Sequence, residues 1–158
     1  MRKITTSTRR LGRVASLASA TALLLGAAVA TAAPASAGED CATGYHCVFM
    51  GALGSEKHSY YNSDRDFTND RFDEICSACH SQIVNDNVWS ASNSSTGGYE
   101  SHYYYDIDFG GGLVFCVNPG SQVNSGQLST DGVAGNHVGQ RDEASSLQLR
   151  GTTSIHCF

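Results

Sequence analysis

The sequence predicts an all-β protein built from two similar halves, and three observations lead to this prediction. Residues 103–117 read as two strands joined by a tight corner, because aromatic and β-branched residues flank consecutive glycines at 110–112. Asn118, Pro119 and Gly120 then end the second strand, since proline donates no hydrogen bond to a ladder. An earlier aromatic strand at 47–49 begins a first half of the same kind.

The first 37 residues have the pattern of a secretory signal peptide and are excluded from the fold. Five of the ten basic residues precede an apolar stretch from residue 14 to about residue 33, and Ala35-Ser36-Ala37 supplies a cleavage frame before Gly38. An uncleaved membrane anchor is the alternative interpretation of this stretch. We therefore expect a secreted, extracellular protein whose domain spans residues 38–158, with no membrane contact after cleavage.

The charge of the remaining chain limits its classes of partner. Residues 38–158 keep five basic residues against all fifteen acidic ones, a net charge of −10. Affinity for nucleic acid comes mainly from basic side chains that neutralise phosphates, so a nucleic-acid partner is not expected. Such acidity fits solubility outside the cell, or binding of a cation or a basic protein.

All six cysteines follow residue 37, and an even number in a small exported protein is typical of disulfides. Cys41 is expected to pair with Cys47, because the five residues between them can form a turn. Cys116 is expected to pair with Cys157, which would tie the last residues to the strand pair at 103–117.

Cys76 and Cys79 would then pair with each other or exchange partners with the long-range pair. They also belong to the sequence C-x-x-C-H, which ends at His80 and matches the attachment pattern of a c-type haem. A small c-type cytochrome would be mostly helical, whereas the residues that follow here are strand-like and rich in Ser, Asn and Gly. Disulfide cysteines and a surface histidine are therefore preferred, and no cofactor is required.

From Cys41 onward the chain divides into halves at about 41–98 and 99–158, joined by the polar linker 92–98. Each half ends with a polar turn and an alternating strand. The turns have the sequences NDNVWS at 85–90 and RDEASS at 141–146. Because one half alone would bury too little apolar surface, two four-stranded units are expected to pack as a sandwich around one core.

These residues resemble the βγ-crystallin Greek key. The segment YYYDIDFGGG is similar to its aromatic corner, with Tyr104, Phe109 and Gly111 at the matching positions, and both turns resemble its [ND]-[ND]-x-x-[ST]-S calcium motif. The first half keeps the aromatic Phe49 but lacks the second aromatic residue and the glycine of the corner. With the C-x5-C clip near its start, the exported chain resembles the streptomycete metalloproteinase inhibitor family, which implies a βγ-crystallin-like double Greek key.

The resemblance also implies calcium sites. In the family each ion takes oxygens from the acidic or amide pair of one motif and a hydroxyl from the fifth position of the other motif. Here Asn85 and Asp86 would find the hydroxyl of Ser145, which predicts one calcium site. The reciprocal site would hold Arg141 and would find Trp89 in place of a hydroxyl, and a guanidinium opposes a dication that needs oxygen ligands. The alternative is that these polar residues only cap their turns.

The same resemblance implies inhibition of a protease. The reactive bond of the family joins a cysteine to a valine, and Cys116-Val117 resembles it, with Asn118 next in a loop closed by Pro119 and Gly120. The family's partner cysteine lies five residues further on, where this chain has Ser121. The alternative interpretation of Cys116-Val117 is a buried strand end.

Catalytic motifs are missing from the sequence, so an enzyme is not expected. His102 and Glu100 could touch, because residues two apart share a strand face, but no nucleophile accompanies them. We expect a secreted peptidase inhibitor that acts on an extracellular protease, with a metalloproteinase as the preferred target class. The alternatives are a calcium-binding extracellular structural or binding module and an antifungal protein of the killer-toxin kind, and the oligomeric state is left open.

Overall fold

The computed structural model describes residues 40–72, 82–129 and 139–158. The expected signal peptide and the C-x-x-C-H segment lie outside these residues. The described chain contains three short 3-10 helices, η1 (Phe67–Asn69), η2 (Ile107–Phe109) and η3 (Ser125–Gln127). Its strands are β1 (His46–Phe49), β2 (Lys57–Tyr60), β3 (Ser90–Asn93), β4 (Glu100–Tyr104), β5 (Leu113–Val117), β6 (Gln122–Val123) and β7 (Ser146–Arg150). Among the described residues, no helix has the length and apolar character needed to cross a membrane.

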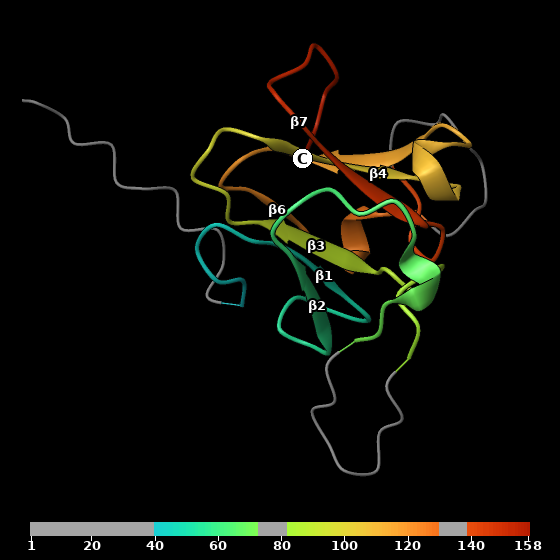
Figure 1. Ribbon diagram of the computed structural model, residues 1–158. Coiled ribbons are helices and arrows are strands. Elements are labelled where there is room, and N and C mark those ends of the chain that lie inside the picture. Colours follow the sequence, from blue (N-terminus) through green and yellow to red (C-terminus); the bar gives the residue numbers. More distant parts are fainter. Residues whose placement is uncertain (1–39, 73–81, 130–138) are drawn as a thin grey trace, which may run out of the picture. The chain divides into compact units, whose positions relative to one another are not determined.

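The strands form two antiparallel sheets, which confirms the predicted all-β class. The first sheet has the order β2-β1-β3-β6 and the second has the order β5-β4-β7 (Figure 1). β6 belongs to the second half of the sequence yet pairs with β3 of the first half. In return, Asp64 of the first half bridges to Leu147 of β7. The halves thus exchange segments, as in the expected double Greek key. The second sheet has three described strands instead of four, because the segment around Asp64 makes only this bridge.

Side chains from both sheets meet in one apolar core. Val48 of β1 and Ala91 of β3 face Tyr103 of β4 and Phe115 of β5 within a single buried cluster. The rings of Tyr103 and Phe115 stack with their centroids 4.5 Å apart. Because side chains alternate along a strand, His102 of β4 and Cys116 of β5 point to the opposite face of their sheet, where they are also buried.

The predicted aromatic corner joins β4 to β5. The rings of Tyr104 and Phe109 lie 6.0 Å apart, and η2 forms the turn between the strands. Gly111 has a φ of +69°, and a Cβ there would lie 2.8 Å from side-chain atoms of Asp106 and Tyr105. Only glycine fits this position without displacing its neighbours.

The two halves repeat the same contact between the last motif residue and the hairpin loop. Ser90 Oγ donates to the carbonyl oxygen of Gly51 over 2.7 Å. Ser146 Oγ donates to the carbonyl oxygen of Asp106 over 2.7 Å. The first hairpin therefore keeps the support of the second, although it lacks the aromatic corner.

Asn93 shows where the predicted linker differs from the structure. Residues 92 and 93 were expected in the linker but complete β3. The reason is that the Asn93 amide is buried and donates to the carbonyl oxygens of Tyr99, at 2.8 Å, and Val117, at 3.0 Å. These bonds fix the start of the second half against β3.

Two disulfides lie in the described chain, and both match the expected pairs. Cys41 bonds to Cys47 beside Phe49, on the face of β1 away from the main core. Cys116 bonds to Cys157. The second bond holds the end of the chain beside the edge strand β5, where Phe158 N donates to the carbonyl oxygen of Cys116 over 3.0 Å.

Candidate functional site

The two motif-bearing turns contact each other through reciprocal backbone bonds. Asp86 N donates to the carbonyl oxygen of Ala144 over 3.1 Å, and Asp142 N donates to the carbonyl oxygen of Val88 over 3.0 Å. Both aspartates occupy the second motif position, and both have left-handed backbone angles, with φ of 56° and 66°. Aspartate tolerates this region better than most residues because its short side chain bonds locally. The turns are thus related by an approximate twofold axis.

The three residues predicted to bind calcium come together at the first turn. Ser145 Oγ donates to Oδ1 of Asp86 over 3.2 Å, and Asn85 Nδ2 donates to Oδ2 of Asp86 over 2.6 Å. Oδ1 of Asn85 is buried and has no hydrogen-bond partner within the described part of the chain. Half a turn of this amide would exchange Nδ2 for Oδ1 and place a second oxygen beside the carboxylate.

The sequence analysis did not identify two further carboxylates that lie at the first turn. Asp106 and Glu143 line the same surface hollow of about 640 Å³ as Asp86, Ser145 and the hydroxyl-bearing Thr68. Glu143 is the third residue of its motif, so its position next to the site could have been inferred. Asp106 has no such signal, because it reaches the hollow only through the corner that follows β4.

The second turn has a different chemistry. The Arg141 guanidinium lies over the ring of Trp89, 4.7 Å from its centroid. Trp89 takes the place that Ser145 occupies at the first turn. Burial raises the pKa of Asp142, while the hydrogen bond from Trp89 and the charge of Arg141 oppose that rise. A stacked cation beside a shielded carboxyl gives this turn no set of free oxygens for a metal ion.

The residues expected to contact a protease lie in β5 and at its end. Cys116 and Val117 are 2% and 0% exposed, and their ladder partners are His102 and Ser101. Asn118 is half-buried, and its Nδ2 donates to the carbonyl oxygen of Cys157 over 3.1 Å. The backbone of the Cys116-Val117 bond is therefore paired and covered.

The side chains of His102 and Glu100 are in contact, as strand alternation predicted. His102 Nε2 lies 2.8 Å from Oε2 of Glu100, and both residues are buried. A second buried histidine, His46, places Nδ1 2.6 Å from Oγ of Ser101. Burial lowers the pKa of His46 to about 4, so this ring is neutral at pH 7.

Comparisons with known proteins give one structural similarity. No protein-family model matches the sequence. No curated protein matches it either. A solved structure from work on the evolution of the eye lens βγ-crystallin domain fold is similar, with 17% sequence identity and a TM-score of 0.47. The similarity covers 73% of this chain and 94% of that one.

Proposed function

We propose that the protein is a secreted module of the βγ-crystallin kind whose fold is stabilised by one calcium ion. The ion would be held by Asn85, Asp86 and Ser145. The observation that carries this proposal is the bond between Ser145 Oγ and the Asp86 carboxylate, whose residues lie 59 positions apart in the sequence. An orphaned amide oxygen on Asn85 lies in the same turn.

The residues of the hollow suit calcium by their chemistry. Ca²⁺ takes six to eight oxygen ligands from carboxylates, amides, hydroxyls, backbone carbonyls and water. Asp86, Asp106 and Glu143 bring three carboxylates to one hollow, where like charges without a cation would repel one another. A bound dication would remove that repulsion. It would also link the first half, through Asp86, to the second half, through Ser145.

Thermal unfolding with added calcium, and then with a chelator, tests the proposal. Calcium is expected to raise the melting temperature, because a ligand at about 100 times its Kd adds roughly 2.7 kcal/mol to the free energy of unfolding. Asp86→Asn should lose this response. Asp142→Asn, at the equivalent position of the other turn, should keep it.

Calorimetric titration gives the stoichiometry in the same samples. One calcium ion per chain is expected for the natural chain and for Asp142→Asn. A melting temperature that ignores calcium, or equal responses in the two variants, would contradict the proposal.

Peptidase inhibition is the second proposal, and the turn after β5 favours it. Ser121 N donates to the carbonyl oxygen of Asn118 over 3.0 Å, and Gly120 N donates to that of Asn93 over 2.8 Å. A segment held in this way would lose little entropy on binding a protease. We rank inhibition below calcium binding, because the Cys116-Val117 peptide bond is covered. Dose-dependent inhibition of a thermolysin-type metalloproteinase, unaffected by Asp86→Asn, would reverse the order of the two proposals.

A further inference from the structure

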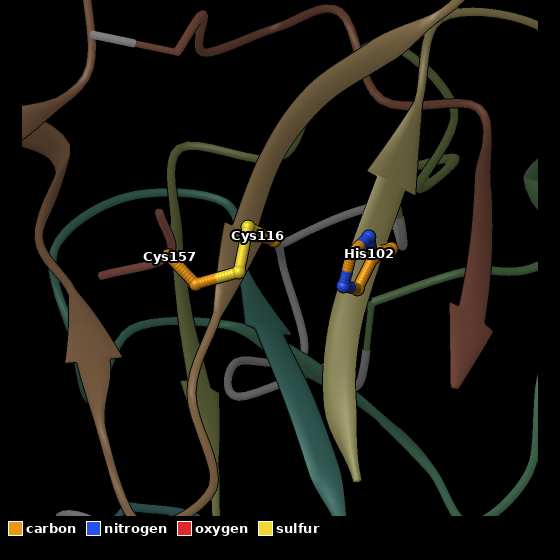
Figure 2. A group of neighbouring side chains, drawn as sticks. All are labelled: His102, Cys116 and Cys157. Atoms are coloured by element: carbon orange, nitrogen blue, oxygen red, sulfur yellow. A yellow bond between two sulfur atoms is a disulfide. The ribbon is translucent and has the colours of Figure 1, made fainter. Parts of the chain in front are cut away.

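A buried cluster on the outer face of the β5-β4-β7 sheet has no part in the calcium proposal. It consists of His102, Cys116 and Cys157, which offer one ligand atom each, and these atoms all lie within 4.8 Å of one another (Figure 2). His102 and Cys116 are cross-strand partners on β4 and β5. The disulfide brings Cys157 to them from the last residues of the chain.

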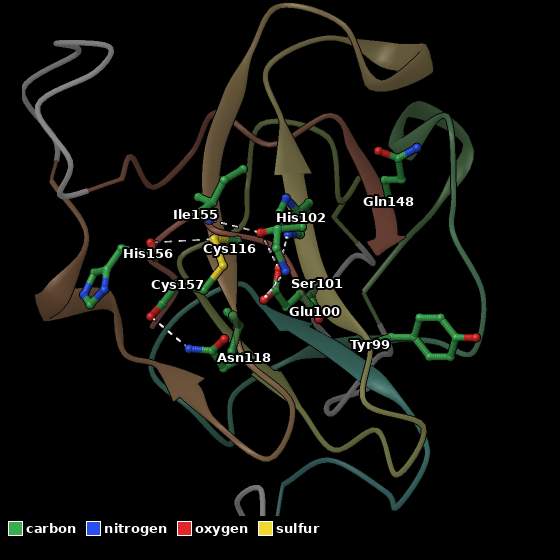
Figure 3. Close-up of polar contacts among 12 residues, drawn as sticks. Tyr99, Glu100, Ser101, His102, Cys116, Asn118, Gln148, Ile155, His156 and Cys157 are labelled. Atoms are coloured by element: carbon green, nitrogen blue, oxygen red, sulfur yellow. Dashed lines mark hydrogen bonds and ion pairs between the residues drawn. A yellow bond between two sulfur atoms is a disulfide. The ribbon is translucent and has the colours of Figure 1, made fainter. Parts of the chain in front are cut away.

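A chain of polar contacts holds the His102 ring in one orientation. The Glu100 carboxylate accepts two bonds from Thr153, whose N lies 3.0 Å from Oε1 and whose Oγ1 lies 2.8 Å from Oε2. Oε2 of Glu100 also lies 2.8 Å from His102 Nε2 (Figure 3). Both oxygens of Glu100 accept from Thr153, whose Oγ1 itself accepts from Ile155 N. The carboxylate is therefore the acceptor in its contact with His102, and Nε2 carries the proton.

This protonation leaves an unused lone pair on the other ring nitrogen. Nδ1 of His102 is buried and has no hydrogen-bond partner among the residues that the structure describes. A buried acceptor without a donor costs about 1–3 kcal/mol and calls for an explanation. A carboxylate that fixes one nitrogen while the other stays free is the arrangement that surrounds metal-binding histidines.

We propose that the chain binds one zinc-like divalent ion through His102, Cys116 and Cys157 once the disulfide between the two cysteines is reduced. A tertiary phosphine, for example, gives two electrons to the Cys116–Cys157 bond. It takes an oxygen atom from water, whose two hydrogens become the protons of the new thiols. Both thiols then lose their protons as the ion binds, because the thiolate is the ligand.

The spacing of the cluster suits a tetrahedral ion. Zinc binds sulfur at about 2.3 Å and imidazole nitrogen at about 2.0–2.1 Å, which places its ligand atoms roughly 3.5–3.8 Å from one another. The three ligand atoms already lie within 4.8 Å, so the sulfurs need only separate after their bond breaks. Water would complete the coordination. The ion prefers thiolate sulfur and imidazole, and it therefore differs from the calcium ion proposed for the oxygen-lined hollow.

The inference is tested by titrating the reduced full chain with Co²⁺. The visible spectrum of this ion reports tetrahedral coordination by thiolates. When both are reduced, the natural chain should bind one more equivalent of Co²⁺ than the double variant Cys116→Ser, Cys157→Ser. The double variant measures binding to the other four cysteines. His102→Gln should lower the affinity of that equivalent about 100-fold, and Glu100→Gln about 10-fold. The matched control is His156→Gln, because His156 is exposed and adjoins Cys157, and it should leave the affinity unchanged.

A second measurement starts from the oxidised chain and follows the reduction of its disulfide. Zn²⁺ binds only the reduced form, so it should lower the concentration of dithiol that cleaves Cys116–Cys157 in a peptide map. This shift should persist in His156→Gln and vanish in His102→Gln. Reduction that is independent of Zn²⁺, or Co²⁺ binding that is equal in the natural chain and His102→Gln, would overturn the inference.

Discussion

The Ser145 hydroxyl donates to the Asp86 carboxylate over 3.2 Å, whereas the equivalent place at the other turn holds the ring of Trp89. The backbones of the two turns match, since each aspartate N–H bonds to the fourth residue of the other motif. Their capacities for a cation differ because of side chains alone. Arg141 and Trp89 stack where the first turn presents oxygen atoms. We therefore predict that the fold can accommodate two cation sites of the proposed kind.

Replacing the stacked pair should create a second calcium site. The double variant Arg141→Asn with Trp89→Ser would restore an amide and a hydroxyl beside Asp142, on a backbone that already has the required shape. Calorimetric titration is expected to give two calcium ions per chain instead of one. The control is Arg141→Asn with Trp89→Phe, which removes the charge but supplies no hydroxyl, and it should still give one. A single ion in both variants would contradict the prediction.

The corner glycines differ in how much space they have, which gives a prediction for stability. Gly111→Ala should lower the free energy of unfolding by roughly 2–3 kcal/mol, because the left-handed φ of +69° adds strain and the new Cβ would lie 2.8 Å from the Asp106 and Tyr105 side chains. At Gly112 the φ is +94°, and no described residue beyond its chain neighbours lies within 4 Å of an added Cβ, so Gly112→Ala should cost only the strain of about 1 kcal/mol. Urea unfolding measures both, and equal losses would show that steric contact with Asp106 is unimportant.

Local pattern was enough to predict the corner and the turns, because each of these elements depends on residues close in sequence. Phe109 and Gly111 lie within one hairpin, and the two motif turns were visible as NDNVWS and RDEASS. The exchange of segments between halves could not be predicted in the same way. This exchange depends on contacts such as the bridge between Asp64 and Leu147. The segment around Asp64 is short and polar, so its sequence has no alternating pattern that would predict a strand.

The candidate sites were predicted to different extents for the same reason. The motif gave Asp86 and Ser145, but Asp106 reached the hollow through a separate loop. The pairing of Glu100 with His102 followed from strand alternation. The position of the disulfide against His102 depended on the registers of β4 with β5 and on the path of the last eight residues, neither of which has a signature in one sequence.

The two disulfides should contribute unequally to stability. The chain-entropy relation gives about 4 kcal/mol for closing the loop between Cys116 and Cys157, which are 41 residues apart, and about 2 kcal/mol for Cys41 and Cys47, which are 6 apart. Double serine variants at each pair should lower the free energy of unfolding in that order. Guanidinium unfolding of the two variants under oxidising conditions measures the difference, and the reverse order would rule out loop entropy as the dominant effect.

Buried His46 should make stability depend on pH between about 6.5 and 4. Burial lowers the folded-state pKa of His46 to about 4, against 6.5 when the chain is unfolded. In that interval the unfolded chain binds a proton that the folded chain does not. Stability therefore falls as the pH is lowered, and this contribution is constant below pH 4.

The pKa difference corresponds to roughly 3 kcal/mol, because one unit is worth about 1.4 kcal/mol. His46→Gln can keep a hydrogen bond to Ser101 without titrating, so it should remove most of the slope between pH 6.5 and 4 in urea unfolding. His156→Gln, at an exposed position, should keep the slope. If the His46→Gln variant kept the slope of the natural chain across this interval, the acid sensitivity would have to come from carboxyl groups, and a lowered pKa of His46 in the folded state would be ruled out.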